Sequence, residues 1–179
     1  MKDKPFKELL VKLDTELVST VKDDVTRHLA LLRKNRVDFY GYAIQTPTFT
    51  NVEQPIAIYN REGDIEEDNK DSAYYRYSVD EWQNYENNAL AKTTTLMSTL
   101  DEQFKQLARN PDDDGKIDKY YPKVYKLFAQ ALAELKAEGA FPEDTFLIVW
   151  NEDEELLVKF AKQLNATKVA KVFAEEFGF

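Results

Sequence analysis

The sequence Phe146-Leu147-Ile148-Val149-Trp150 is apolar at every position. A strand with one face in water alternates apolar and polar residues, whereas a strand covered on both faces is apolar throughout. We therefore predict a central strand over residues 146–150, with both faces of the sheet covered at that point.

Three stretches nearer the N-terminus predict the rest of the sheet. In residues 38–44, aromatic and small residues alternate, as they do in a strand with two unlike faces. Residues 54–59 and 72–79 indicate two further strands, joined by an acidic loop with Gly63 at its turn. Because short connections favour antiparallel pairing, the sequence predicts a small, mostly antiparallel sheet of about four strands.

Helical spacing of apolar residues appears on both sides of these strands. From residue 6 to residue 32 the spacing alternates between three and four, which predicts a long amphipathic N-terminal helix. Ser78 and Glu81 match a capping box, and the apolar spacing after them predicts one long helix that ends at Arg109. Three more helices are predicted closer to the C-terminus, over residues 121–135, 154–163 and 166–176.

Together these elements predict an α+β fold in which a small sheet packs with a long N-terminal helix and several C-terminal helices. The sequence contains no linker, internal repeat or low-complexity stretch that would divide it. We therefore expect a single domain over residues 1–179.

The composition excludes several classes of active site. The 179 residues include no cysteine, so disulfides, thiolate metal sites and thiol nucleophiles are excluded. His28 is the only histidine, and its place at the edge of the N-terminal apolar stripe predicts a half-buried structural role. No GxSxG motif, glycine-rich phosphate loop or HExxH motif occurs. The sequence therefore predicts no catalytic residues and no cofactor, although a pair among its 33 acidic residues could still serve as acid and base.

Charge and hydropathy restrict the partners. The formal net charge of −9 repels phosphate backbones, which argues against nucleic acid as a partner. No apolar run approaches the roughly 20 residues that cross a bilayer, and the N-terminus lacks the apolar core of a secretory signal. We expect a cytoplasmic protein without membrane association.

One segment resembles a calcium-binding loop. If Asn110 is taken as position 1 of an EF-hand loop, then Asp112, Asp114 and Asp118 occupy positions 3, 5 and 9, and a glycine occupies position 6. Position 12 is Tyr121, so the bidentate carboxylate that completes the calcium shell is missing. The pattern indicates a weak metal site at best, and a plain Asp/Gly turn between two helices is the alternative.

A second candidate site combines acidic and aromatic residues. Glu66, Glu67 and Asp68 lie in the acidic loop, which is either a solvated connection or a negative surface that attracts a basic partner. Tyr74 and Arg76 share one face of the strand predicted over residues 72–79, and a tryptophan, Trp82, follows at the predicted helix start. These side chains either pack in the core or, if exposed, form an interface hot spot.

The run Tyr75-Arg76-Tyr77-Ser78-Val79-Asp80-Glu81-Trp82, together with Phe39-Tyr40-Gly41-Tyr42-Ala43 and the strand over residues 146–150, resembles the bacterial domain-of-unknown-function family 4303. The resemblance spans nearly the whole chain, and it implies a small bacterial domain with no established reaction. By analogy of size and charge, such domains are similar to immunity proteins that neutralise toxins. The favoured hypothesis is a non-enzymatic domain that binds another, basic protein. The alternatives are a carboxylate-based enzyme acting on a small molecule and a weak calcium-binding protein.

Overall fold

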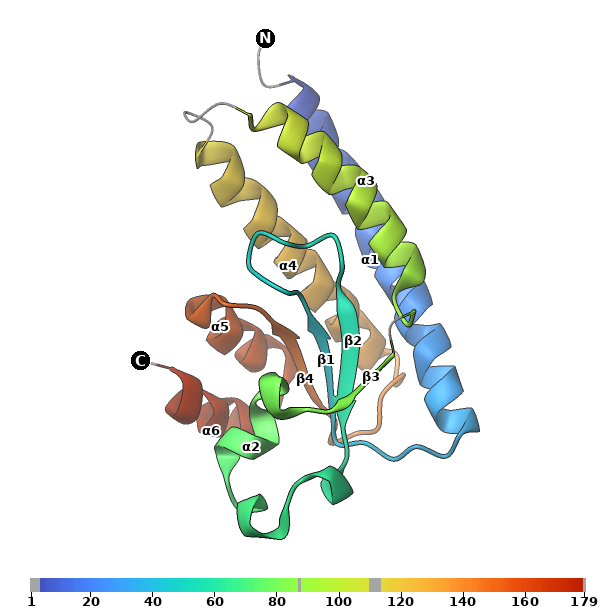
Figure 1. The fold of residues 1–179 in the computed structure, drawn as a ribbon, viewed down its shortest axis with the longest axis vertical. Coiled ribbons are helices and arrows are strands. Elements are labelled where there is room, and N and C mark those ends of the chain that lie inside the picture. Colours follow the sequence, from blue (N-terminus) through green and yellow to red (C-terminus); the bar gives the residue numbers. More distant parts are fainter. Residues whose placement is uncertain (1–3, 87, 110–113, 179) are drawn as a thin grey trace.

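A computed structural model describes residues 4–86, 88–109 and 114–178 of the chain (Figure 1). Its sheet has four strands in the order β3-β2-β1-β4. The strands are β1 (Gly41–Gln45), β2 (Ile56–Asn60), β3 (Asn84–Glu86) and β4 (Phe146–Trp150). β2 runs antiparallel to both β1 and β3, while β4 runs parallel to β1, so the sheet is mixed. The predicted α+β class is confirmed, and two of the three strand pairings are antiparallel.

Helices flank the sheet on two sides (Figure 1). α1 (Lys4–Lys34) packs along α3 (Ala91–Leu107) and α4 (Asp114–Ala137), and α4 also contacts β4. α5 (Glu154–Leu164) and α6 (Thr167–Phe177) pack together on the other side, where α5 contacts β4. Within the described residues, no helix is both long enough and apolar enough to cross a membrane.

The long N-terminal helix is confirmed, and its apolar stripe is the centre of the core. Leu13, Leu17, Val21 and Val25 are completely buried, as their three- and four-residue spacing predicts for one face of a helix. α4, α5 and α6 also form where helical spacing predicts them. The N-cap of α5 is Asp153, whose side chain accepts a hydrogen bond from the amide of Leu156.

The apolar strand over residues 146–150 forms as β4, but it lies at the edge of the sheet instead of its centre. All five of its residues are buried because α4 and α5 pack against it. The Asn165 side chain donates to the carbonyl of Leu147 at 2.7 Å and accepts from its amide at 2.8 Å. The Asn165 side-chain amide thus satisfies backbone hydrogen-bonding groups of β4 that a neighbouring strand would otherwise satisfy. An apolar run reports burial of both faces and does not distinguish a central strand from a covered edge.

The prediction of a strand over residues 72–79 is wrong. Residues 73–77 form the single-turn helix α2 (Ala73–Tyr77), and a 3-10 helix, η3 (Val79–Glu81), follows it. Tyrosine is frequent in strands because it packs well there, and it is also accepted in a helix whose neighbours offer aromatic surface. Here Tyr74 stacks on Phe177 of α6, and Tyr77 packs against Phe146 of β4.

The long helix predicted from the Ser78 capping box to Arg109 is also wrong. Ser78 makes no side-chain cap hydrogen bond, and the chain runs through η3 and β3 before α3 begins at Ala91. The cap of α3 comes from another helix. Asp24 of α1 accepts hydrogen bonds from the amide of Thr93 at 2.8 Å and from its hydroxyl at 3.0 Å. The start of α3 is therefore capped by a side chain of α1, and not by the local capping box that the sequence pattern indicates at Ser78.

Candidate functional site

Consecutive side chains of α2 line three separate cavities. Arg76 and Tyr77 line the first, Tyr75 lines the second, and Tyr74 lines the third. We name them the Arg76 cavity, the loop cavity and the aromatic–acidic cavity. The 3-10 helices η1 (Glu62–Asp64) and η2 (Glu67–Asn69) lie in the segment that precedes α2, and α6 packs beside it (Figure 1).

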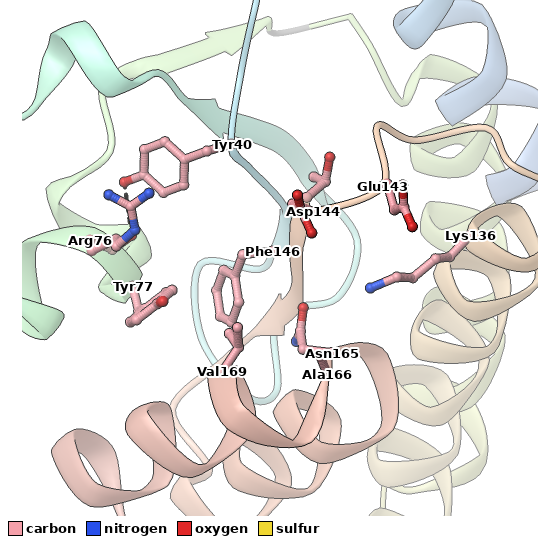
Figure 2. Close-up of a pocket in the computed structure, with 11 residues that line it drawn as sticks. Tyr40, Arg76, Tyr77, Lys136, Glu143, Asp144, Phe146, Asn165, Ala166 and Val169 are labelled. Carbon is pink, nitrogen blue, oxygen red and sulfur yellow. Dashed lines mark hydrogen bonds between the residues drawn. The ribbon is translucent and has the colours of Figure 1, made fainter.

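The Arg76 cavity has a volume of about 290 Å³ and holds charges of both signs. In Figure 2, Arg76, Tyr40 and Tyr77 lie on one side, Lys136 and the acidic residues lie on the other, and Phe146 stands between them. Its walls are formed by Tyr40, Arg76, Tyr77, Lys136, Glu143, Asp144, Thr145, Phe146, Asn165, Ala166 and Val169.

Arg76 is held by neighbours within the chain. Its guanidinium pairs with both carboxylate oxygens of Glu62, one of them at 3.1 Å, and lies 4.4 Å from the centroid of the Tyr40 ring. The Glu62 carboxylate raises the pKa of Arg76, and burial opposes the effect. The Tyr40 hydroxyl donates to the backbone carbonyl of Arg76 at 2.8 Å, and burial raises the pKa of Tyr40 to about 12. The charge of Arg76 is therefore already paired with a carboxylate.

On the opposite wall, Lys136 completes the end of a helix. Its ammonium donates to the carbonyl of Leu164, the last residue of α5, at 2.7 Å. Burial lowers the pKa of Lys136, and the nearby Asp144 carboxylate opposes that effect. A lysine at the carbonyl end of a helix satisfies a free acceptor and complements the helix dipole. Both basic groups of this cavity thus have structural partners.

Trp82 is only 4 % exposed, so it lies beneath this surface and does not form part of it. Its ring covers Gly41 of β1, where an added Cβ atom would come within 2.5 Å of the ring. Its indole nitrogen donates to the carbonyl of Arg76 at 3.3 Å. Trp82 therefore positions α2 on the sheet, and its burial excludes direct contact with a partner in this conformation.

The loop cavity lies between α2 and the acidic loop, with a volume of about 280 Å³. Glu66 lines it, whereas Glu67 and Asp68 lie outside its walls; all three are exposed. Within the described residues, Glu67 pairs with Lys70, and neither Glu66 nor Asp68 forms an ion pair. The remaining walls are Asn60, Asp64, Ile65, Asn69, Tyr75, Glu81 and Gln83.

The aromatic–acidic cavity is the largest of the three, at about 440 Å³. Among its walls only Tyr74 belongs to the predicted site. Sequence reasoning missed the others because, apart from Ser78 and Asp80, they come from the ends of β1 and β4, from α5 and from α6, which lie far from Tyr74 in the chain. Its walls are Gln45, Thr46, Pro47, Tyr74, Ser78, Asp80, Trp150, Asn151, Glu152, Glu154, Leu157, Glu176 and Phe177.

Metal-ligating clusters are absent from the part of the chain that the structure describes: no three His, Cys, Asp or Glu residues are placed to hold an ion. Of the EF-hand-like positions, Asn110 and Asp112 lie outside the described residues. Asp114 begins α4 and Asp118 lies exposed in its first turns. The calcium hypothesis stays a prediction.

One pair of carboxylates has pKa values shifted in opposite directions, which is a property of acid–base pairs in enzymes. Burial raises the pKa of Asp101, whereas a hydrogen bond from Lys105 lowers the pKa of Glu53. The Asp101 carboxylate is completely buried, and neither residue lines any of the three cavities. The pair therefore lies apart from the α2 surface.

Comparison with known proteins finds one family. A protein-family model described as Domain of unknown function (DUF4303) matches residues 17–166. No curated protein and no solved structure matches.

Proposed function

We propose that this chain, which belongs to the domain-of-unknown-function family DUF4303, is a non-enzymatic domain that binds a basic protein. The surface we assign to this role is the α2 face, defined as Tyr74, Tyr75, Glu66, Glu67 and Asp68. The observation that carries the proposal is the exposure of two adjacent tyrosines beside two carboxylates, those of Glu66 and Asp68, that form no ion pair among the described residues.

The two tyrosines supply the apolar part of the α2 face. Tyr74 is 40 % exposed and Tyr75 is 38 % exposed, which is unusual for large aromatic side chains of this protein. Their rings pack edge to face with centroids 5.5 Å apart, so the pair presents a fixed aromatic surface. Tyrosine is enriched at the energetic centre of protein interfaces because it buries a large area at a small entropic cost.

The carboxylates supply selectivity for a basic partner. Glu66 and Asp68 have no cationic partner among the described residues, and they lie in a chain with a net charge of −9. A surface of this kind attracts a positively charged protein over long range and speeds its association. The same charge repels nucleic acids. The finer form of the proposal is a cytoplasmic immunity protein whose partner is a toxin, which rests on analogy of size and charge.

The test is capture of the partner by tagged protein from a lysate of the source cells, read by mass spectrometry. A variant carrying Glu66→Lys, Glu67→Lys and Asp68→Lys should lose the partner. A matched control carries the same charge change on α1 and α3, with Glu8→Lys, Asp23→Lys and Glu102→Lys.

We expect the wild type and the control variant to retain one basic protein in stoichiometric amount, because the control leaves the α2 face intact. Equal capture by the loop variant and the wild type would refute the assigned surface. Absence of any stoichiometric partner in both would refute the proposed function.

A further inference from the structure

The aromatic–acidic cavity extends the α2 face, since Tyr74 belongs to both. Resting on the proposed function, we infer that this cavity receives an arginine side chain of the basic partner. Its volume of about 440 Å³ falls within the range of about 300–1,000 Å³ that is typical of small-ligand sites.

The charge of the cavity selects a cation. Carboxylates of Asp80, Glu152, Glu154 and Glu176 line it, and among the residues that the structure describes no lysine, arginine or histidine does. Throughout the described residues none of these carboxylates forms an ion pair. The hydrogen bonds of Asp80 come from neutral donors, namely the Gln45 amide and the Trp150 indole, both at 3.0 Å. The negative charge of the cavity is therefore uncompensated.

The aromatic walls favour a planar cation. The Trp150 and Phe177 rings are perpendicular, with centroids 5.8 Å apart, and Tyr74 stacks on Phe177 at 6.0 Å. A guanidinium stacks on aromatic faces and pairs with carboxylates through two parallel hydrogen bonds. An ammonium lacks that planar shape, so arginine fits this combination better than lysine.

A buried donor independently points to a ligand that carries a carbonyl. Asn151 lines the cavity and is 4 % exposed. Its side-chain oxygen accepts from the amide of Asp153 at 2.7 Å, whereas its side-chain nitrogen has no acceptor within the described residues. A buried amide donor without a partner is costly, and a peptide carbonyl would satisfy it. An arginine within a polypeptide offers both the cation and the carbonyl.

The test is a nitrogen–proton NMR titration of the whole chain with the probe acetyl-Gly-Arg-Gly-amide. Trp150 is a built-in reporter because its indole N–H donates to Asp80 in the cavity, and the buried Trp82 indole is the internal reference. We expect the Trp150 indole resonance to shift and saturate while the Trp82 resonance stays fixed. The same peptide with citrulline, an uncharged analogue of arginine, should cause no shift, and the lysine peptide should bind more weakly.

A matched pair of variants tests the position. Glu154→Gln with Glu176→Gln should weaken binding of the probe about fivefold, because two exposed carboxylates are lost. Glu155→Gln with Glu175→Gln makes the same charge change one residue away, outside the cavity walls, and should leave binding within about twofold. An unshifted Trp150, an equal response to citrulline, lysine binding as tight as arginine binding, or equal weakening by both variant pairs would overturn the inference.

The arginine inference and the proposed function can be refuted independently of each other. If charge reversal in the acidic loop abolishes partner capture but the arginine peptide does not bind, the arginine assignment alone fails. If the peptide binds and no protein is captured, the proposed function is refuted, whereas the inference that the cavity binds an arginine side chain stands.

Discussion

Replacing Gly41 by alanine should displace the tryptophan that holds α2. The Cβ atom of an alanine at this position would lie 2.5 Å from Cη2 and 2.8 Å from Cζ2 of Trp82. Both distances are shorter than any normal contact, and the ring is buried between β1 and α2, so it has little space to move. Because the Trp82 indole also donates to the carbonyl of Arg76, a displaced ring should move the end of α2.

The expected magnitude follows from two opposing effects. Overpacking a core by one methyl group costs about 1–3 kcal/mol. Replacing a glycine within a strand recovers about 0.5–1 kcal/mol of backbone entropy. We therefore expect Gly41→Ala to lower the free energy of unfolding by about 1–2 kcal/mol. Gly63→Ala is the control, because no atom from elsewhere in the described chain lies within 4 Å of its Cβ position, and it should leave stability unchanged or slightly raised.

Urea unfolding followed by circular dichroism measures both variants. Adding Trp82→Phe to Gly41→Ala removes the distal ring atoms that clash, so the double variant should recover about 1 kcal/mol relative to the sum of the single changes. An unchanged unfolding free energy for Gly41→Ala, or strict additivity in the double variant, would refute the reasoning that Trp82 is fixed by this contact.

Three further predictions concern buried polar groups. Asp24→Ala removes the acceptor for two hydrogen bonds from Thr93 and should lower the unfolding free energy by about 3 kcal/mol in urea; a loss below about 1 kcal/mol would contradict the interhelical cap. Burial lowers the pKa of His28, so the unfolded chain binds the proton more readily, and stability should fall as pH drops below about 6.5, with a slope of at most about 1.4 kcal/mol per pH unit. The stability difference between wild type and His28→Gln should shrink over that range, and a constant difference would contradict a neutral buried imidazole. Lys105→Met leaves the buried Asp101 carboxylate without its cation and should cost about 2 kcal/mol in urea, most of which Asp101→Asn should restore; no recovery would contradict the pairing.

Periodic segments of the sequence were sufficient to predict most of the helices and three of the four strands. In α1 and α4 the apolar stripe runs along many turns. A pattern of that length identifies a helix with one buried face from the sequence alone. The strand over residues 146–150 could also be predicted from the sequence, because every one of its residues is apolar and buried. Its place at the sheet edge could not be predicted, since the covering side chain, Asn165, comes from the end of α5 and reaches Leu147 only in the folded chain.

The segment between β2 and α3 could not be predicted, because long-range contacts determine it. Tyr74 is fixed by Phe177 at the far end of the chain, and α3 receives its cap from Asp24 of α1. Local patterns at Ser78 and Glu81 point to a capped helix that tertiary packing does not allow. The predicted site residues Glu66 and Tyr74 line cavities of the α2 face, whereas Trp82 lies beneath it. The carboxylates of the aromatic–acidic cavity come from three separate segments, at Asp80, at Glu152 and Glu154, and at Glu176, and show no common sequence pattern.

Site-specific photo-crosslinking in the source cells tests most directly whether the α2 face binds a protein. A benzophenone amino acid would replace Tyr75 on the α2 face, and in a parallel strain it would replace Val11, which is 59 % exposed on α1. We predict that one basic protein becomes cross-linked through position 75 and not through position 11. The cross-link should disappear when Glu66, Glu67 and Asp68 are changed to lysine. Cross-linking of the same protein from both positions, or of none from position 75, would contradict the proposal that this face is the binding surface.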